Sequence, residues 1–504
     1  MFYFVNQYLL SNNSSIEHAE IKRLKLFKKN NVLAKLVTRD FSSILHENGT
    51  LHRFGLEDDQ IVNMYDYFAG TVDYKGQQMH VEDLALPYRY QVGAGNSSRE
   101  VKDGQQLIAE IFFIGGTIGQ IDHVDYYDNA GNVTLRQKYD VRGFKAIDIF
   151  MGKDGMVDYE QYYRPDGTCY LERYYVRSTQ NTAYNSRNIL KKYKGRDRYF
   201  NGLDDLFVFF LNELNEENND VNAFIADRPA TSINPVISIS DKAKKYLWLP
   251  ISHVDDGDDQ TTGPFNPFLQ GALTVDGIWD GIITMTSHQA EALRQRIKIK
   301  TPIFTVNGSP VSPTKKIPMS KRKQNQLIYV GRLGKDKQTD RLIEMFAKIH
   351  QQVKNASLMI YGYGSPDDTK ELKNLISQYH LEKVVKLAGY QVKLEKAYEQ
   401  AQLFVDPSRV DGQPLAMAEA LSYGLPVISY DYPYGPNEMI QPGENGELIP
   451  LNDEDKFIQT VIAVLDDPER LQRMSENAYE NLESINEDKT WEEWKKIMTK
   501  DNFC

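Results

Sequence analysis

The sequence predicts an α/β protein with two parallel-sheet domains and an antiparallel β-meander inserted in the first. Short apolar runs followed by helical patterns occur at both ends of the chain, for example in FYFVNQYLL and in LIYVGRLGKDKQTDRLIEMF. This alternation is typical of parallel sheets covered by helices. The segment 45–185 differs, because Tyr-, Val- and Thr-rich runs alternate there with turn signals. A length of 504 residues suits two or three domains.

The N-terminal segment begins with a strand, a loop and a helix. The strand FYFVNQYLL is followed by the polar loop SNNSS and by a helix expected from Ile16 to about Lys29. Ser14 and Glu17 have the S-x-x-E spacing of a capping box, which satisfies N–H groups at a helix start. We therefore assign residues 1–44 to the first parallel-sheet domain.

The inserted segment, residues 45–185, is predicted to be a series of hairpins. Gly131, Gly143, Gly155 and Gly167 recur at a spacing of twelve, between alternating runs such as MVDYEQYY and TCYLERYYV. Asp-Gly and Asn-x-Gly turns between such runs indicate antiparallel strands. The sheet would offer an edge and a tyrosine-rich face to a partner chain or an extended polymer. A purely structural extension is the alternative.

The α/β pattern resumes after the insertion. Within 186–312, GLDDLFVFFLNEL indicates a helix, AFIADRP and KYLWLPISHVDD indicate strands, and GIITMTSHQAEALRQRI indicates a strand and a helix. The Pro- and Lys-rich run PTKKIPMSKRKQNQ is expected to be an interdomain linker. It opens the second domain, residues 313–485. The last segment, 486–504, contains the amphipathic helix TWEEWKKIM.

Composition favours a soluble enzyme of the cytoplasm. The apolar fraction of 41% is sufficient for real cores. No run approaches the roughly 18 apolar residues of a transmembrane helix, and the N-terminus lacks the pattern of a signal peptide. Cys169 and Cys504 do not make a disulfide framework. A net charge of −11 argues against general nucleic-acid binding.

Two carboxylates mark the stretch VDGQPLAMAEALSYGLPVISYD, residues 410–431. Asp411 opens a turn at a helix start, and Glu419 follows eight positions later. Eight residues are a little over two helical turns, so both acids lie along roughly one line. The backbone of the helix start could hold an anion, helped by the helix dipole; these residues are Gly412, Gln413, Pro414 and Leu415. An ordinary turn in an α/β domain is the alternative.

Two cations follow the first strand of the second domain. The strand ends at Val330, Arg332 comes directly after Gly331, and Lys337 lies five residues on, near the next helix. Two cations at a strand-to-helix turn are suited to a diphosphate leaving group when no metal neutralises it. Together with Asp411 and Glu419, they predict a site for a phosphate-bearing ligand.

These motifs resemble a known enzyme family. GRL with Lys337, YGYG (361–364), LAGY (387–390) and PSRVDGQPLAMAEALSYGLPVI resemble the C-terminal half of the retaining GT-B glycosyltransferases of family 4. The resemblance covers residues ~325–450 and implies two Rossmann-like domains facing a cleft. The family's usual motif is Glu-x(7)-Glu. Asp411 replaces its first glutamate, next to the donor sugar, and Glu419 matches the second, which holds the ribose hydroxyls.

The resemblance also assigns further residues. His253, where a strand leaves the sheet, matches a family position that bonds the donor sugar. Ser14 and Ser15 lie in the first loop, near the donor phosphate or the acceptor, although helix capping explains them equally well. Backbone at Gly389 and Tyr390 is expected to meet uracil. Gly362, in YGYG, is assigned to the donor site. In such proteins the last helix crosses back to the first domain, where Trp491 and Trp494 would anchor it.

A narrower resemblance concerns the acceptor. NNSSIEHAEIKRLKLFKKN and the tyrosine-rich meander resemble staphylococcal glycosyltransferases that decorate Ser-Asp-repeat adhesins. This implies transfer of N-acetylglucosamine from UDP-GlcNAc to serine. The family resemblance implies retention, and we expect no cofactor or metal because Arg332 and Lys337 supply the positive charge. The partners would be UDP-GlcNAc and an acidic Ser-Asp-repeat polypeptide, and the meander could join a homo-oligomer. The basic runs 191–198 and 298–300 are candidates for an acceptor groove.

Rival interpretations remain open. A teichoic-acid α-glycosyltransferase would share the donor residues and differ in the acceptor groove. A non-catalytic, acceptor-binding partner subunit would have no need for Arg332, Lys337 and Glu419 together. A glycogen-type polymerase would not need the meander. Asp256-Gly-Asp258 has the D-x-D spelling of metal-dependent transferases, but Arg332 and Lys337 would supply the metal's charge, and we interpret it as a solvated loop.

Overall fold

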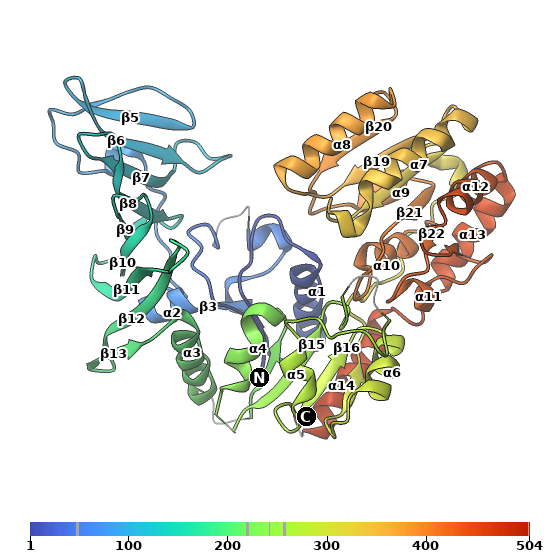
Figure 1. Cartoon of the computed structure of the whole chain (residues 1–504), viewed down its shortest axis with the longest axis horizontal. Coiled ribbons are helices and arrows are strands. Elements are labelled where there is room, and N and C mark those ends of the chain that lie inside the picture. The colour runs from blue at the N-terminus through green and yellow to red at the C-terminus, as the bar shows by residue number, and fades with distance from the viewer. Residues whose placement is uncertain (47–49, 218–220, 241, 256–258, 502, 504) are drawn as a thin grey trace.

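The protein consists of three parts: a central first domain, an inserted antiparallel sheet and a second domain. In the computed structural model the described residues are 1–46, 50–217, 221–240, 242–255, 259–501 and 503. The first domain lies between the inserted sheet and the second domain, and both ends of the chain lie in it (Figure 1). The predicted Asp256-Gly-Asp258 motif and Cys504 fall outside the described residues.

The first domain is built on a parallel sheet. Its strands are β1 (Phe2–Asn6), β2 (Ala34–Thr38), β3 (Ile61–Asn63), β14 (Ala223–Ala226), β15 (Lys244–Leu249), β16 (Gly281–Thr284) and β17 (Ile303–Thr305). Its helices are α1 (Ser15–Lys29), α2 (Met64–Ala69), α3 (Leu203–Glu217), α4 (Pro229–Ile237), α5 (Gln270–Thr274) and α6 (Ser287–Arg296). The strand order is β17-β16-β15-β14-β1-β2-β3. From β1 the chain adds β2 and β3 on one side of the sheet, and from β14 it adds the later strands on the other side. Ligands of such sheets bind at this switch point, beyond the carboxyl ends of the strands.

The second domain repeats this plan. Its strands are β18 (Gln326–Val330), β19 (Ser357–Tyr361), β20 (Val385–Gly389), β21 (Leu403–Asp406), β22 (Val427–Tyr430) and β23 (Gly446–Ile449). Its helices are α7 (Thr339–Gln352), α8 (Pro366–Gln378), α9 (Glu395–Gln400), α10 (Leu415–Ser422), α11 (Pro436–Met439), α12 (Glu454–Leu465) and α13 (Pro468–Glu480). The parallel order is β20-β19-β18-β21-β22-β23. The switch point therefore lies between β18 and β21, whose following loops carry the predicted cations and Asp411.

The last helix, α14 (Glu487–Lys500), packs on the first domain. Trp494 is buried and stacks on Trp248 of β15, with ring centroids 6.1 Å apart. Trp491 packs edge-on against Phe27 of α1. The end of the chain thus belongs to the apolar core between the first sheet and α1.

The inserted sheet is antiparallel, and its strands follow one another in chain order. They are β4 (Gln91–Val92), β5 (Ser98–Asp103), β6 (Gln106–Phe113), β7 (Ile121–Tyr127), β8 (Val133–Asp140), β9 (Phe144–Met151), β10 (Val157–Tyr163), β11 (Cys169–Arg177), β12 (Ala183–Tyr193) and β13 (Arg196–Phe200). Gly131, Gly143, Gly155 and Gly167 occupy turns between successive strands with φ of +74° to +86°, a region that favours glycine. The prediction of an antiparallel meander is confirmed.

The boundaries of the insertion differ from the expected 45–185. β3 pairs in parallel with β2, and α2 packs into the core of the first domain, so residues 61–69 belong to that domain. At the other end, β12 and β13 continue the antiparallel sheet to Phe200. The early boundary was misplaced because β3 is only three residues long and directly follows a short 3-10 helix, Asp58–Gln60, which hides its strand pattern.

A largely buried ionic network attaches the insertion to the first domain. Arg142, in the turn between β8 and β9, bonds to Asp66 of α2 at 2.6 Å and to Asp140 at 2.7 Å. His46 lies between Asp66 and Asp58, with Nε2 at 2.8 Å from the first and Nδ1 at 3.0 Å from the second. Burial lowers the pKa of His46, but the two carboxylates outweigh burial and Arg142, so this pKa lies above its usual value.

This network predicts a pH-dependent stability. Because the pKa of His46 is higher in the folded than in the unfolded protein, its contribution is complete below the unfolded value of about 6.5 and is lost as pH rises through the folded value. We expect the Tm of the wild type to fall from pH 6 to pH 8 by more than that of His46→Gln. Thermal unfolding of both proteins over this range measures the difference, and parallel curves would contradict it.

No helix within the described ranges is both long and apolar enough to cross a membrane.

Candidate active site

The candidate site is a cavity of about 580 Å³ between the two parallel-sheet domains. The first domain contributes the loop after β1 and one face of α1. The second contributes the loops after β18, β19, β20 and β21, and the start of α10. The predicted residues that line the cavity are Ser14, Ser15, Arg332, Lys337, Gly362, Tyr390, Asp411, Pro414, Leu415 and Glu419. Gly389, Gly412, Gln413 and His253 do not line it.

Lys337 and Asp411 are brought together at the switch point of the second sheet. Lys337 follows β18 and Asp411 follows β21, and these strands are neighbours. The Lys337 Nζ donates to Asp411 Oδ2 at 2.7 Å and to the Val410 carbonyl at 3.0 Å. Burial lowers the pKa of Lys337, but Asp411 and Asp406 outweigh it and raise this pKa above its usual value. The ammonium is therefore charged, and its position is fixed.

Arg332 lies on the more exposed rim of the same loop. Its Nη2 bonds to Asp336 Oδ2 at 2.7 Å, and its side chain is 49% exposed. An exposed pair of this kind is worth about 0–1 kcal/mol, so the guanidinium is easily transferred to a stronger anion. A diphosphate offers such an anion and accepts two parallel bonds from the guanidinium.

The start of α10 offers fewer N–H donors than the sequence suggested. Pro414 has no N–H, and the Gly412 N–H donates to the Asp411 carboxylate at 2.7 Å. Gln413 is buried, and its side chain accepts from the Gly308 N–H of the first domain at 2.8 Å. Of the predicted set, Leu415 remains as a first-turn donor beside the cavity. Gly412 packs too closely on Pro250 to carry a side chain.

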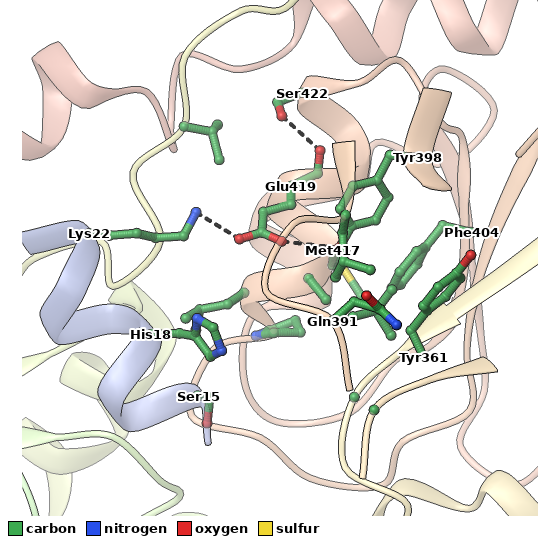
Figure 2. Close-up of a pocket in the computed structure, with 18 of the residues that line it drawn as sticks. Ser15, His18, Lys22, Tyr361, Gln391, Tyr398, Phe404, Met417, Glu419 and Ser422 are labelled. Atoms are coloured by element: carbon green, nitrogen blue, oxygen red, sulfur yellow. Dashed lines mark hydrogen bonds and ion pairs between the residues drawn. The ribbon is translucent and has the colours of Figure 1, made fainter. Parts of the chain in front are cut away.

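Glu419 points from α10 toward α1 of the first domain (Figure 2). Its Oε1 lies 2.9 Å from the Lys22 Nζ, and its Oε2 accepts from the Tyr398 hydroxyl at 3.1 Å. Burial raises the pKa of Glu419, but Lys22 is the strongest of the groups that outweigh it, so the pKa lies below its usual value. The site thus contains an ionised carboxylate at this end of the cavity, away from Lys337.

The loops after β19 and β20 form the wall next to Tyr390. The Gly362 N–H donates to the Gly389 carbonyl at 3.0 Å. Gly362 has φ of +141°, and a Cβ there would lie 1.7 Å from the Gly331 carbonyl oxygen, so only glycine fits. The Tyr390 hydroxyl is 2.9 Å from His18 Nε2 of α1. Tyr390 therefore contacts the first domain through its side chain.

Ser14 and Ser15 occupy the start of α1, with different surroundings. The N–H and hydroxyl of Ser14 both donate to Glu17 Oε2, at 2.9 and 2.7 Å. This is the capping contact expected from the S-x-x-E spacing. Ser15 is exposed beside the cavity. Of the two hydroxyls, that of Ser15 is the better placed for a ligand.

His253 lies behind the cavity wall and is fully buried. Its Nε2 contacts the Gln260 carbonyl at 2.9 Å, and its Nδ1 lies 3.4 Å from the Tyr434 hydroxyl. Burial lowers the pKa of His253 to about 4, so the ring is neutral near pH 7. Because both nitrogens have protein partners, the predicted bond from this ring to the donor sugar would require a rearrangement.

The polar cavity residues that sequence reasoning missed include His18, Lys22 and Tyr398. His18 and Lys22 are four positions apart on the face of α1 that lines the cavity. That spacing was visible in IEHAEIKRLK, but charged residues on a helix are usually solvated. Tyr398, on α9, is buried and had no distinctive motif.

The other predicted charge clusters lie elsewhere. Lys191, of the expected acceptor groove, pairs with Asp197 and Glu172, and Lys194 with Glu213, on the hairpin that ends the inserted sheet next to α3. These cations are therefore partly neutralised. Among the described residues, no group of three or more His, Cys, Asp or Glu side chains could hold a metal ion.

The cavity can hold a ligand that is anionic at one end and rich in hydroxyls at the other. Arg332, Lys337 and the start of α10 supply positive charge at the first end. Glu419 accepts hydroxyl groups at the second end, where aromatic rings add flat apolar surface; they include Tyr361, Tyr398 and Phe404 (Figure 2). A nucleoside-diphosphate sugar has this distribution of charge and hydroxyls.

Comparisons with known proteins agree with this geometry. Residues 312–481 match the family Glycosyl transferases group 1. The pneumococcal O-GlcNAc transferase GtfA, solved in complex with UDP and GlcNAc, superposes with a TM-score of 0.84 and 21% identity, covering 99% of this chain and 98% of that one. The fold is GT-B. The predicted fold class is therefore confirmed.

A second family match lies in the inserted sheet, and two curated relatives match most of the chain. Residues 90–194 match the GtfB middle domain. The GtfA subunit of the UDP-N-acetylglucosamine–peptide N-acetylglucosaminyltransferase of Streptococcus agalactiae is 24% identical, over 96% of this chain and 95% of that protein. The poly(ribitol-phosphate) alpha-N-acetylglucosaminyltransferase of Staphylococcus aureus is also 24% identical, over 89% of this chain and 90% of that protein. The particular resemblance to transferases of Ser-Asp-repeat adhesins is not among these findings.

Proposed function

We propose that this protein is a retaining glycosyltransferase that moves N-acetylglucosamine from UDP-GlcNAc to serine hydroxyls of an acidic Ser-Asp-repeat polypeptide. The observation that carries the proposal is the interdomain cavity with Lys337 bonded to Asp411 at one end and Glu419 at the other. The names of both curated relatives include N-acetylglucosamine as the sugar transferred. A polypeptide acceptor is supported by the name of the first relative, which gives a peptide as its acceptor. The choice of serine comes from the sequence resemblance to transferases of Ser-Asp-repeat adhesins.

In the proposed reaction, the bond between the sugar C1 and the diphosphate oxygen breaks and a bond from C1 to the serine oxygen forms on the same face. The serine proton passes to the leaving phosphate oxygen, so no protein nucleophile is needed. Lys337 and Arg332 stabilise the negative charge that develops on the diphosphate. Asp411 fixes Lys337 and lies next to the sugar, while Glu419 holds the ribose hydroxyls. UDP-GlcNAc is a substrate, and the mechanism uses no cofactor or metal.

A teichoic-acid α-glycosyltransferase is the second candidate. It is favoured by the Staphylococcus aureus relative, which matches this chain at the same identity as the peptide transferase. The donor site would be the same in both cases. A non-catalytic partner subunit is less well supported, because binding an acceptor would not require Lys337, Asp411 and Arg332 at one site.

The decisive experiment pairs donors with acceptors. We expect UDP-GlcNAc, rather than UDP-glucose, to modify a Ser-Asp-repeat polypeptide, with a mass increase of one or more N-acetylhexosamines and an α-linkage by NMR. Poly(ribitol phosphate) serves as the competing acceptor in parallel reactions. Transfer to it alone would overturn the protein acceptor, and release of no UDP with either acceptor would overturn the enzyme assignment.

The reaction is expected to be independent of metal. Arg332 and Lys337 supply the positive charge that a divalent ion provides in metal-dependent transferases. We therefore expect the initial rate to be unchanged in EDTA. A sharp loss of rate that Mn²⁺ restores would contradict this and direct attention to Asp256 and Asp258.

A further inference from the structure

Helix α1 of the first domain forms one wall of the donor cavity. Its cavity-facing residues recur at helical spacing and include Ser15, His18 and Lys22. Two of these side chains reach the second domain: Lys22 bonds to Glu419, and His18 to Tyr390. Polar contacts between the two domains therefore help to close this side of the cavity.

The geometry at Glu419 leaves room for a ligand beside Lys22. One carboxylate oxygen faces Lys22 and the other accepts from Tyr398. A carboxylate offers about four acceptor positions, so about two remain for the hydroxyls of a bound ribose. The side chains of Lys22 and Glu419 are 22% and 29% exposed, so solvent reaches the pair only in part. Lys22 therefore does not have to leave when a nucleotide enters.

We infer that Lys22 is a positioning residue of the donor site: from the first domain, it holds the Glu419 carboxylate of the second domain in the orientation that accepts the two ribose hydroxyls. This inference rests on the proposed function, because it takes Glu419 as the ribose ligand. It has a mechanical consequence. The ribose half of the site is complete only while the domains are in contact, so recognition of the ribose hydroxyls is coupled to domain closure.

Binding of two nucleotides tests this role without any acceptor. The dissociation constants of UDP and 2′,3′-dideoxy-UDP are measured by calorimetry for the wild type, Lys22→Met, Lys22→Arg and Lys28→Met. Lys28 is the matched control, because it lies on the same helix but pairs with Glu57 at the exposed surface, outside the cavity. Melting curves establish that each variant is folded.

The wild type is expected to prefer UDP over the dideoxy ligand by about ten- to hundredfold, the effect of hydrogen bonds to a charged group. Lys22→Met should reduce this preference to a few fold by weakening UDP binding, while dideoxy-UDP binding changes little. Lys28→Met should keep the full preference, and Lys22→Arg should restore most of it. In transfer assays, Lys22→Met should raise KM for the donor far more than it lowers kcat.

Other outcomes overturn the inference in separate ways. If Lys22→Met keeps the full preference for UDP, Lys22 does not position Glu419, and the ribose role of Glu419 itself is unaffected. If Lys22→Met weakened the binding of UDP and of 2′,3′-dideoxy-UDP equally, Lys22 would have a structural role instead. Absence of any preference in the wild type would remove the ribose role of Glu419 itself. None of these results depends on which acceptor is used, so failure of the acceptor assignment remains distinguishable.

Discussion

Lys337→Met is expected to lower kcat for sugar transfer by about 10²–10³-fold, with a much smaller change in KM. Its ammonium is fixed by Asp411 and the Val410 carbonyl at the switch point where the diphosphate would depart. Charge on the diphosphate grows as the C1–oxygen bond breaks, so this cation acts more strongly in the transition state than on the bound substrate. Removal of such a group lowers kcat rather than raising KM. Methionine keeps the aliphatic volume, which limits the effect on folding.

Arg332→Ala should also lower kcat. Because its ion pair with Asp336 is exposed, the loss of folding stability should be within about 0.5 kcal/mol. Lys335→Ala is the matched control, since Lys335 lies between the two on the same loop but pairs with Asp340 and Glu371 outside the cavity. Initial rates and melting curves for the three variants separate catalysis from folding. Near wild-type turnover of Lys337→Met would reject the proposed donor site.

Topology explains why the sequence predicted these cations and Asp411 as one site. They are far apart along the chain, but each follows a strand next to the switch point, and a parallel sheet brings the ends of such strands to one edge. The strand before Gly331 was predicted from its short apolar run, whereas β21, the strand before Asp411, was not among the expected elements. The prediction therefore needed no knowledge of side-chain packing.

Contacts between the two domains could not be predicted from the sequence in this way. Lys22 meets Glu419 only because the domains pack with α1 over α10, and no local pattern specifies that packing. For His253, the position in the sequence suggested a contact with the ligand that its surroundings in the structure do not offer. Its place at a strand end was suggestive, yet its environment depends on the loop carrying Gln260 and on Tyr434 of the second domain. At the start of α10, the missing N–H of Pro414 could have been foreseen from the sequence, whereas the bond from the Gly412 N–H to the Asp411 carboxylate could not.

Neutralising each of the two carboxylates of the site is expected to change a different kinetic constant. Glu419→Gln keeps a partner for Tyr398 but loses the ion pair with Lys22. Ribose contacts are the same in the ground and transition states, so KM for UDP-GlcNAc should rise by about ten- to hundredfold while kcat stays close to that of the wild type.

Asp411→Asn should instead lower kcat, by about 10²-fold, because Asp411 fixes Lys337 and, in the proposed reaction, would lie beside the reacting sugar. Since the two side chains are hydrogen-bonded, their effects should not add, and the double variant with Lys337→Met should be little slower than Lys337→Met alone. Steady-state kinetics of the single and double variants measure this coupling.

If Asp411→Asn and Glu419→Gln changed kcat and KM alike, or if the double variant showed the full product of the two losses, the different roles proposed for the carboxylates would be wrong. A carboxylate that positions a cation acts through that cation, and only its coupling to Lys337 separates this role from a direct bond to the sugar.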